Sequence, residues 1–172
     1  MLKLLNKALS TESQFQLRFY LARAEGLLHR SRFRKLKMPE GGWPILFGNS
    51  FPKSGTNLLA QILTGFSRVA PFTPHSPLHM GLGETDPKRR QALLEKQFAR
   101  LRPLDIITAH LPARREMLER ITSPTFLSYF ILRDPRDIVV SRVFYVTEIE
   151  KRHRLHEHYS ENLHSMDERL MA

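Results

Sequence analysis

Cysteine is absent from this chain of 172 residues, and two classes of protein are excluded with it. A chain without cysteine builds neither a disulfide framework nor a thiolate metal site, a composition that fits a cytoplasmic protein. The sequence also lacks any apolar run of about 20 residues, the length that a helix needs to cross a bilayer. Near the N-terminus, Lys3, Asn6 and Lys7 interrupt the apolar residues, so the compact apolar core of a secretory signal is not formed.

Acidic residues are scarce relative to basic ones, and the imbalance is concentrated in the first quarter of the chain. There are 27 Lys and Arg against 17 Asp and Glu, a formal net charge of +10. Residues 1–40 hold nine Lys or Arg against three Glu, so they carry +6 of that charge. A basic balance suits an anionic partner, and charge alone does not choose among nucleic acid, a lipid surface and a small polyphosphate.

The basic region forms an extension that precedes the main domain. Leucines recur among its basic residues, a spacing that predicts one or two helices over residues 2–37. The Pro and Gly residues of positions 38–42 end this pattern, so we divide the chain into a basic amphipathic helical extension, 1–40, and a main domain, 41–172. Base rates favour an appendage docked on the domain with solvated arginines. Peripheral contact with an anionic membrane through residues 1–40 is the alternative.

Beyond this boundary, short apolar runs of strand type alternate with helical segments. The predicted strands are residues 44–48, 105–110 and 126–132, and the predicted helices are residues 57–67, 88–101, 114–120, 137–150 and a short run at 166–171. The many Pro and Gly residues of the segment 70–87 predict an irregular loop. Strands that alternate with helices indicate an α/β fold with a parallel sheet and helical crossovers.

A loop suited to an oxyanion lies between the first predicted strand and its helix, at residues 52–56. Backbone N–H groups at a helix N-terminus are unpaired, and the helix dipole favours negative charge there. Gly55 lets the backbone approach an anion closely, Thr56 adds a hydroxyl donor, and Lys53 supplies a point charge. The alternative is a helix capped by Ser or Thr after a proline turn. The sequence therefore predicts a strand–loop–helix site for a phosphate-type anion over residues 45–59.

The loop differs from the Mg-ATP pattern G-x-x-x-x-G-K-[ST]. Gly48 stands five residues before Lys53, but Pro52 occupies the place of the second Gly, and the lysine precedes Ser-Gly-Thr. No predicted strand ends in the Asp that would hold Mg²⁺, because residues 132–134 read Leu-Arg-Asp. These departures count against a P-loop nucleotide kinase, which stays as an alternative function.

Three segments, in order along the chain, carry a resemblance to a known family. Residues 50–57, Ser-Phe-Pro-Lys-Ser-Gly-Thr-Asn, resemble the 5′-phosphosulfate loop of the sulfotransferases that use 3′-phosphoadenosine-5′-phosphosulfate (PAPS). Residues 108–112, Thr-Ala-His-Leu-Pro, resemble the segment that carries the catalytic histidine of the cytosolic-type enzymes. Residues 130–141 resemble the family's 3′-phosphate motif, in which a strand ends in Arg and the next helix carries Ser eight residues later. The matches span about residues 44–145.

The resemblance implies a P-loop-like three-layer α/β fold with a central parallel sheet. It also implies in-line transfer of a sulfuryl group from PAPS to an acceptor hydroxyl or amine, with release of 3′,5′-adenosine diphosphate and no metal. In the implied site, Lys53 stabilises the bridging oxygen, Arg133 and Ser141 bind the 3′-phosphate, and the 5′-phosphate is held by Lys53, Ser54, Gly55, Thr56 and Asn57. From the residues alone, an Arg at a strand end also suits a terminal phosphate, because its guanidinium donates two hydrogen bonds at once. Asp134 and Asp137 are expected to cap the next helix and orient Arg133 or Arg136.

His110 is the candidate base, because a strand-end imidazole can titrate near neutral pH. Related enzymes use a carboxylate instead, and Glu84 or Asp86 of the Pro- and Gly-rich loop is the alternative. Thr108 stands where the cytosolic-type enzymes commonly carry Lys, so the acceptor class stays open among small molecules, lipids and sugars. We expect no nucleic-acid partner.

The remaining histidines do not predict a metal site. Prolines prevent the helix that would bring His75 and His79 to one face. A solvated basic helix explains His153, His156 and His158 better than zinc does.

The resemblance also predicts what the chain lacks. Family members usually continue past the helix of Ser141 to a Gly-rich basic segment, and nothing similar is found before Ala172. We therefore expect the C-terminal part of the fold to be missing, and the isolated chain to bind PAPS weakly. A non-catalytic truncated form, or a basic module that binds lipid or nucleic acid through residues 1–40, is the alternative from another class.

Overall fold

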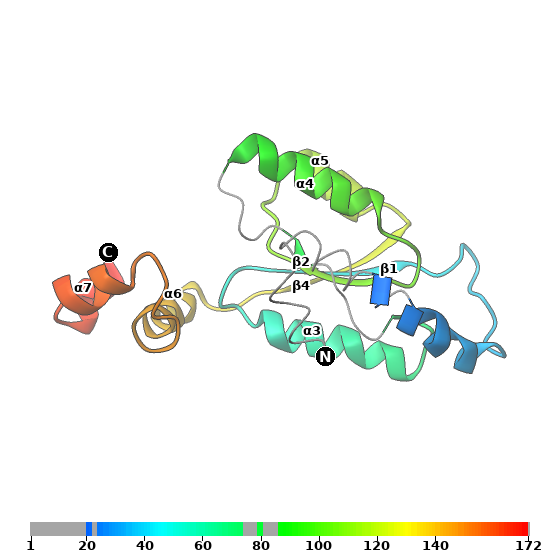
Figure 1. The fold of residues 1–172 in the computed structure, drawn as a ribbon, viewed down its shortest axis with the longest axis horizontal. Helices are drawn as coiled ribbons and strands as arrows, with labels where there is room; N and C mark the ends of the chain where they lie inside the picture. Colours follow the sequence, from blue (N-terminus) through cyan, green and yellow to red (C-terminus); the bar gives the residue numbers. More distant parts are fainter. Residues whose placement is uncertain (1–19, 22–23, 74–78, 81–85, 172) are drawn as a thin grey trace.

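An open parallel sheet forms the centre of the molecule (Figure 1). The computed structural model describes residues 20–21, 24–73, 79–80 and 86–171. The strand order is β2-β3-β1-β4, and neighbouring strands pair in parallel. The strands are β1 (Ile45–Ser50), β2 (His79–Met80), β3 (Ile106–Ala109) and β4 (Phe126–Ile131). The α/β fold with a parallel sheet, predicted from the sequence, is confirmed.

Helices cover both faces of this sheet, an arrangement compatible with three layers. Figure 1 shows α3 on one face and α4 with α5 on the other. The α-helices are α3 (Thr56–Gly65), α4 (Pro87–Ala99), α5 (Arg115–Ile121), α6 (Pro135–Phe144) and α7 (Met166–Met171). Short 3-10 segments are η1 (Ser31–Phe33) and η2 (Phe66–Arg68), and π-helical turns are η3 (Tyr145–Ile149) and η4 (His158–Asn162). None of the helices in the described ranges is long and apolar enough to cross a membrane.

Strand β1 is the centre of the core, because it pairs with β3 on one side and β4 on the other. All six of its residues are buried, as expected for a parallel strand covered on both faces. Ile45 and Phe47 pack towards α4 and α5, whereas Leu46 packs towards α3. A Cβ atom at Gly48 would lie 2.6 Å from Leu63 Cδ1, so this glycine lets α3 approach the sheet closely.

A separate apolar cluster lies beyond the carboxyl ends of the strands. It is formed by α6, η3, η4 and α7 around Val143, Val146 and Tyr159. In Figure 1 these elements lie beside the sheet, at the end from which β4 leaves it. The cluster is therefore next to the sheet edge at which the predicted site residues gather.

The described part of the N-terminal extension is docked on the main domain. Residues 24–30 are helical. A nitrogen of the His29 ring lies 2.7 Å from the Ser67 carbonyl, and Arg30 donates to the Thr73 hydroxyl at 3.2 Å. Leu27 and Leu28 are exposed in the same helix. Of the one or two helices predicted over residues 2–37, residues 2–19 and 22–23 lie outside the described residues, and the α-helix ends at residue 30, where η1 follows.

Three sequence predictions differ from the structure. The segment 70–87 contains β2, because a two-residue strand leaves no periodic pattern for a sequence to show. The helix predicted over residues 137–150 becomes π-helical after Phe144. The segment with His153, His156 and His158 is a solvated helix only in part: residues 151–155 form turns, His158 begins η4 and is exposed, and a ring nitrogen of His156 lies 2.7 Å from the Val146 carbonyl of η3.

Candidate functional site

The carboxyl ends of β1, β3 and β4 meet at one edge of the sheet. The loop of residues 51–55 follows β1, His110 follows β3, and Arg133 follows β4. In the sheet, β2 and β3 lie on one side of β1 and β4 lies on the other, so the strand order changes direction at β1. Open α/β sheets bind ligands at such a switch point. The three sequence motifs therefore arrive at one edge, although about 80 residues of chain separate the first from the last.

The backbone of the loop is shaped to leave the first turn of α3 uncapped. Gly55 is the N-cap residue, with φ 110°, and no side chain caps the helix. The Ser54 hydroxyl turns back to the Phe51 carbonyl at 2.6 Å. A Cβ atom at Gly55 would lie 3.0 Å from Ile131 Cδ1 in addition to the backbone strain. The N–H groups at the start of this ten-residue helix thus have no side-chain acceptor, and the Ser- or Thr-capped alternative is wrong.

Lys53 is held in an unusual backbone conformation at the same loop. Its φ is 69°, in the left-handed region that costs an L-residue with a side chain about 1–2 kcal/mol. Such strain is often found at functional sites. The ammonium Nζ lies 3.8 Å from the centroid of the Tyr145 ring. Partial burial, which disfavours the charged form, lowers the pKa of Lys53 from its ordinary value.

His110 is joined to the loop through Ser50, the last residue of β1. The imidazole Nδ1 lies 2.7 Å from the Ser50 carbonyl and 3.3 Å from its hydroxyl. The same hydroxyl lies 2.7 Å from the Thr56 hydroxyl. A carbonyl accepts but never donates, so Nδ1 carries the proton in this contact and the neutral ring has its lone pair on Nε2. The contact therefore sets the tautomer that a general base requires.

Asn49 fixes the backbone immediately after His110. Its side-chain amide donates to the Leu111 carbonyl at 3.1 Å and accepts from the Leu111 N–H at 2.9 Å. Asn49 is only 5% exposed, so both bonds lie in the protein interior. Asn49 and Ser50 were not predicted from the sequence. The available signal was two polar residues at the end of an otherwise apolar buried strand.

Arg133 leans towards the loop from the end of β4. Its Nη1 donates to the Lys53 carbonyl at 3.4 Å, and its Nε lies 3.5 Å from a carboxylate oxygen of Asp137. Both contacts are long, and the side chain is exposed. The guanidinium is therefore close to the loop but weakly held.

The two aspartates that follow Arg133 act as predicted. Asp134 caps α6 by accepting from the Arg136 N–H at 2.9 Å, and it pairs with the Arg136 side chain at 2.7 Å. The hydrogen bonds from Arg136, chiefly the one from its side chain and then the one from its backbone N–H, hold the pKa of Asp134 below its usual range. Asp137 contacts Arg133, as described above, so the structure assigns one aspartate to each arginine.

The other predicted residues are placed less closely. Asn57 is exposed in the first turn of α3, and Ser141 is half-buried on α6. The Ser141 hydroxyl makes no hydrogen bond within the described part of the chain, so the structure does not join it to Arg133. Asp86 caps α4 by accepting from the N–H groups of Lys88 and Arg89. Glu84, the other carboxylate considered as a base, lies outside the described residues.

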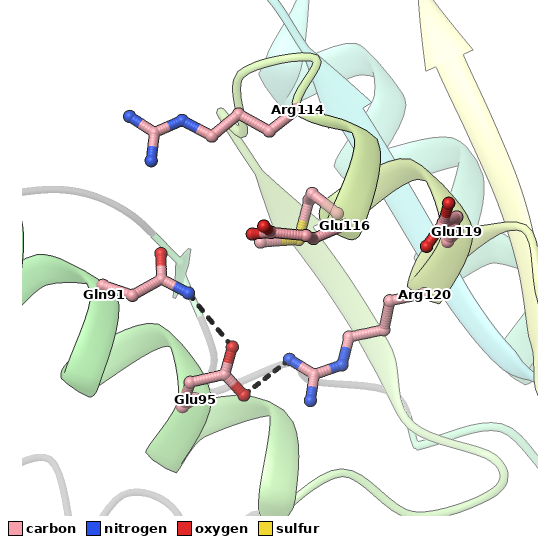
Figure 2. Close-up of a pocket in the computed structure, with 7 residues that line it drawn as sticks. Gln91, Glu95, Arg114, Glu116, Glu119 and Arg120 are labelled. Carbon is pink, nitrogen blue, oxygen red and sulfur yellow. Dashed lines mark hydrogen bonds and ion pairs between the residues drawn. The ribbon is translucent and has the colours of Figure 1, made fainter.

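A cavity of about 150 Å³ lies beside His110, between the N-terminal ends of α4 and α5. Apolar side chains line much of it, including Leu94, Leu111 and Met117. A groove of about 380 Å³ shares Gln91, Arg114 and Met117 with it and runs on between the two helices (Figure 2). Its remaining lining residues are all charged: Glu95, Glu116, Glu119 and Arg120.

Figure 2 shows a chain of polar contacts that joins the two helices lining this groove. Gln91 donates to Glu95 at 3.1 Å, and Arg120 pairs with Glu95 at 2.8 Å. Figure 2 also shows Arg114 and Glu116 on the opposite side of the groove. A ligand that entered here would have His110 at one end and hydrogen-bonding groups along its length.

These features define an α/β protein with a candidate anion site at the carboxyl edge of a parallel sheet and an imidazole joined to that site. Across the described ranges, no three His, Cys, Asp or Glu residues are grouped so that they could hold a metal ion. No protein-family model, no curated protein and no solved structure matches the chain.

Proposed function

We propose that the protein is a P-loop-like sulfotransferase that moves a sulfuryl group from PAPS to an acceptor hydroxyl or amine. The observation that carries the proposal is the connection between loop and imidazole. Thr56 of the loop bonds to Ser50, and Ser50 bonds to His110. A donor-binding loop and a base in the correct tautomer are thus parts of one hydrogen-bonded unit.

The residues present fit the phosphate groups of such a donor. The uncapped first turn of α3, together with Gly55, Thr56 and Lys53, suits the 5′-phosphosulfate end. Arg133, exposed and weakly held beside the loop, suits the 3′-phosphate, because its guanidinium can exchange long contacts for charge-assisted bonds. Ser141 lies on the helix that follows Arg133 and can add a hydroxyl donor.

The bound donor would supply the sulfuryl group, whose bond to the bridging oxygen breaks as the acceptor atom forms its own bond to sulfur. His110 Nε2 takes the proton that the attacking hydroxyl or amine loses. Lys53 and the helix N-terminus stabilise the negative charge that the 5′-phosphate keeps on the bridging oxygen. Ser50 holds the imidazole through its carbonyl, and Asn49 holds the backbone that follows His110, so the orientation of the ring does not depend on the ligand.

The acceptor is proposed to reach His110 through the cavity beside it. The apolar walls near His110 suit the carbon skeleton around the reacting group, and the charged groove beyond suits a polar remainder. Small molecules, lipids and sugars all remain acceptor candidates. Peripheral membrane contact through residues 1–40 stays an alternative means of reaching a lipid acceptor.

The test is a transfer assay with ³⁵S-labelled PAPS against panels of alcohols, phenols, amines, sugars and lipids. His110→Ala should lower turnover about 100-fold or more, the contribution expected of a general base, with donor affinity within twofold. Lys53→Ala should weaken donor binding itself. His153→Ala and Lys151→Ala are matched controls outside the site and should change neither quantity. Magnesium-dependent transfer from labelled ATP would overturn the proposal in favour of the kinase, and no transfer to any acceptor would overturn it in favour of a non-catalytic module. Full activity in His110→Ala would remove His110 as the base.

A further inference from the structure

The ammonium of Lys53 rests on an aromatic ring. Its Nζ lies 3.8 Å from the ring centroid of Tyr145, close enough for a cation–π contact. No carboxylate pairs with Lys53 within the described part of the chain. The ammonium of Lys53, which could bind an anion in the loop, therefore contacts the face of the Tyr145 ring instead.

Tyr145 comes from the part of the chain that follows β4. It is the first residue of η3 and stands four residues after Ser141, so the two lie one turn apart. The ring packs against the cluster of Val143, Val146 and Tyr159. This packing fixes the ring, so the lysine side chain is the movable partner.

We propose that Tyr145 holds Lys53 in a resting position between the loop and α6, and that a phosphate-type anion bound in the loop draws the ammonium off the ring. The inference rests on the proposed function only in treating the loop as an anion site. Tyr145 is thus a positioning residue.

The relative strength of the two contacts supports this direction. A cation–π contact at a partly exposed site is weak, whereas an ammonium–phosphate hydrogen bond is charge-assisted and short. We therefore expect the Lys53 ammonium to leave the ring and bind the anion.

Displacement has a structural consequence. The cation–π contact and the Arg133–Lys53 hydrogen bond both join the loop to residues after β4. An anion that attracts Lys53 and Arg133 replaces both contacts with contacts to itself. The ligand then becomes the link between the loop and the C-terminal cluster.

The experiment is proton–carbon NMR of the lysine ε-CH₂ groups, assigned to Lys53 by its absence in Lys53→Arg. Ring currents should shift this resonance upfield in the free protein, and inorganic phosphate or 3′,5′-adenosine diphosphate should return it towards the usual lysine position. Tyr145→Phe keeps a ring and should behave as wild type. Tyr145→Leu should lose the upfield shift, and it should bind either probe about 2–5-fold more tightly because no contact has to be broken. Phe144→Leu, which changes an exposed neighbour, is the matched control and should change neither value.

A Lys53 resonance that stays upfield at saturating probe, or that shows no upfield shift in the free protein, overturns the inference. So does weaker binding by a folded Tyr145→Leu. If Tyr145→Leu does not fold, the wild-type and Tyr145→Phe titrations decide alone. Displacement by phosphate without any binding of 3′,5′-adenosine diphosphate supports the inference and contradicts the proposed function. Tight binding of that nucleotide with Lys53 still on the ring does the reverse.

Discussion

Strands β1 and β4 have similarly apolar sequences, Ile-Leu-Phe-Gly-Asn-Ser and Phe-Leu-Ser-Tyr-Phe-Ile, but they differ in how they are covered. Strand β1 is buried throughout, whereas Leu127 and Phe130 of β4 are 46% and 59% exposed. The same difference continues into the site. At the end of β1, Asn49 makes buried bonds and Ser50 makes a short, partly buried one, while Arg133 makes long, exposed contacts at the end of β4.

The difference separates two kinds of binding group. The half of the site built on β1 and β3 is held by the chain itself and is ready before a ligand arrives. The half built on β4 and α6 is held weakly, so a ligand can set its geometry at little cost. Mutations should therefore act mainly on stability in the first half and mainly on ligand affinity in the second.

The largest expected effect is on Asn49. In Asn49→Ala, the N–H and carbonyl of Leu111 lose their buried partners, which should lower the free energy of unfolding by roughly 3 kcal/mol. Urea denaturation measures the change. Asn57→Ala, at an exposed asparagine of the neighbouring helix, is the control and should stay within about 0.5 kcal/mol. If Asn49→Ala were equally mild, the β1 half would not be rigidly built.

Gly55 should affect both stability and binding. Gly55→Ala places a side chain at φ 110° and a Cβ atom 3.0 Å from Ile131, which should cost about 1–3 kcal/mol of unfolding free energy. It should also distort the helix N-terminus and weaken phosphate binding. Gly65→Ala is the matched control, because Gly65 is helical and has open space around it, and it should be neutral or stabilising. Equal effects of the two substitutions would contradict the geometry assigned to the loop.

Much of this fold could be predicted from the sequence, because apolar runs and Pro or Gly breaks mark β1, β3, β4 and most helices. The loop was likewise visible in the residue types around Gly55. The residues that hold the loop and His110 in place could not be predicted. Asn49 and Tyr145 act through partners about 60 and 90 residues away along the chain, and no local pattern records such a contact. Strand β2 was not predicted, because two residues are too few to show the alternation of apolar and polar residues that marks a strand.

Arg133 should affect ligand choice without affecting stability. Arg133→Gln should raise the dissociation constant of 3′,5′-adenosine diphosphate about tenfold or more and leave that of 5′-AMP unchanged, because only the first ligand has a 3′-phosphate. The free energy of unfolding should stay within about 0.5 kcal/mol. Arg136→Gln, whose arginine pairs with Asp134, is the control and should change neither affinity. Equal losses for both nucleotides would remove Arg133 from the 3′-phosphate.

The smallest effect concerns the cap of α6. Because hydrogen bonds from Arg136 lower the pKa of Asp134, this carboxylate contributes stability above its unfolded pKa, about 3.9, and the contribution is lost as the pH falls through the lower folded value. Carbon-13 NMR of the carboxyl group should give a midpoint below the usual one. Arg136→Gln should move the midpoint upward. A midpoint at or above the ordinary value would show that the pair does not form in solution.

The most direct test of the phosphosulfate site is calorimetric titration of the wild-type chain with 3′,5′-adenosine diphosphate and with 5′-AMP, both without magnesium. We predict that the bisphosphate binds at least tenfold more tightly than 5′-AMP, because its 3′-phosphate adds a charge-assisted contact, and that Lys53→Ala weakens the binding of both nucleotides. Equal affinities for the two nucleotides, or binding only of ATP in the presence of magnesium, would contradict it.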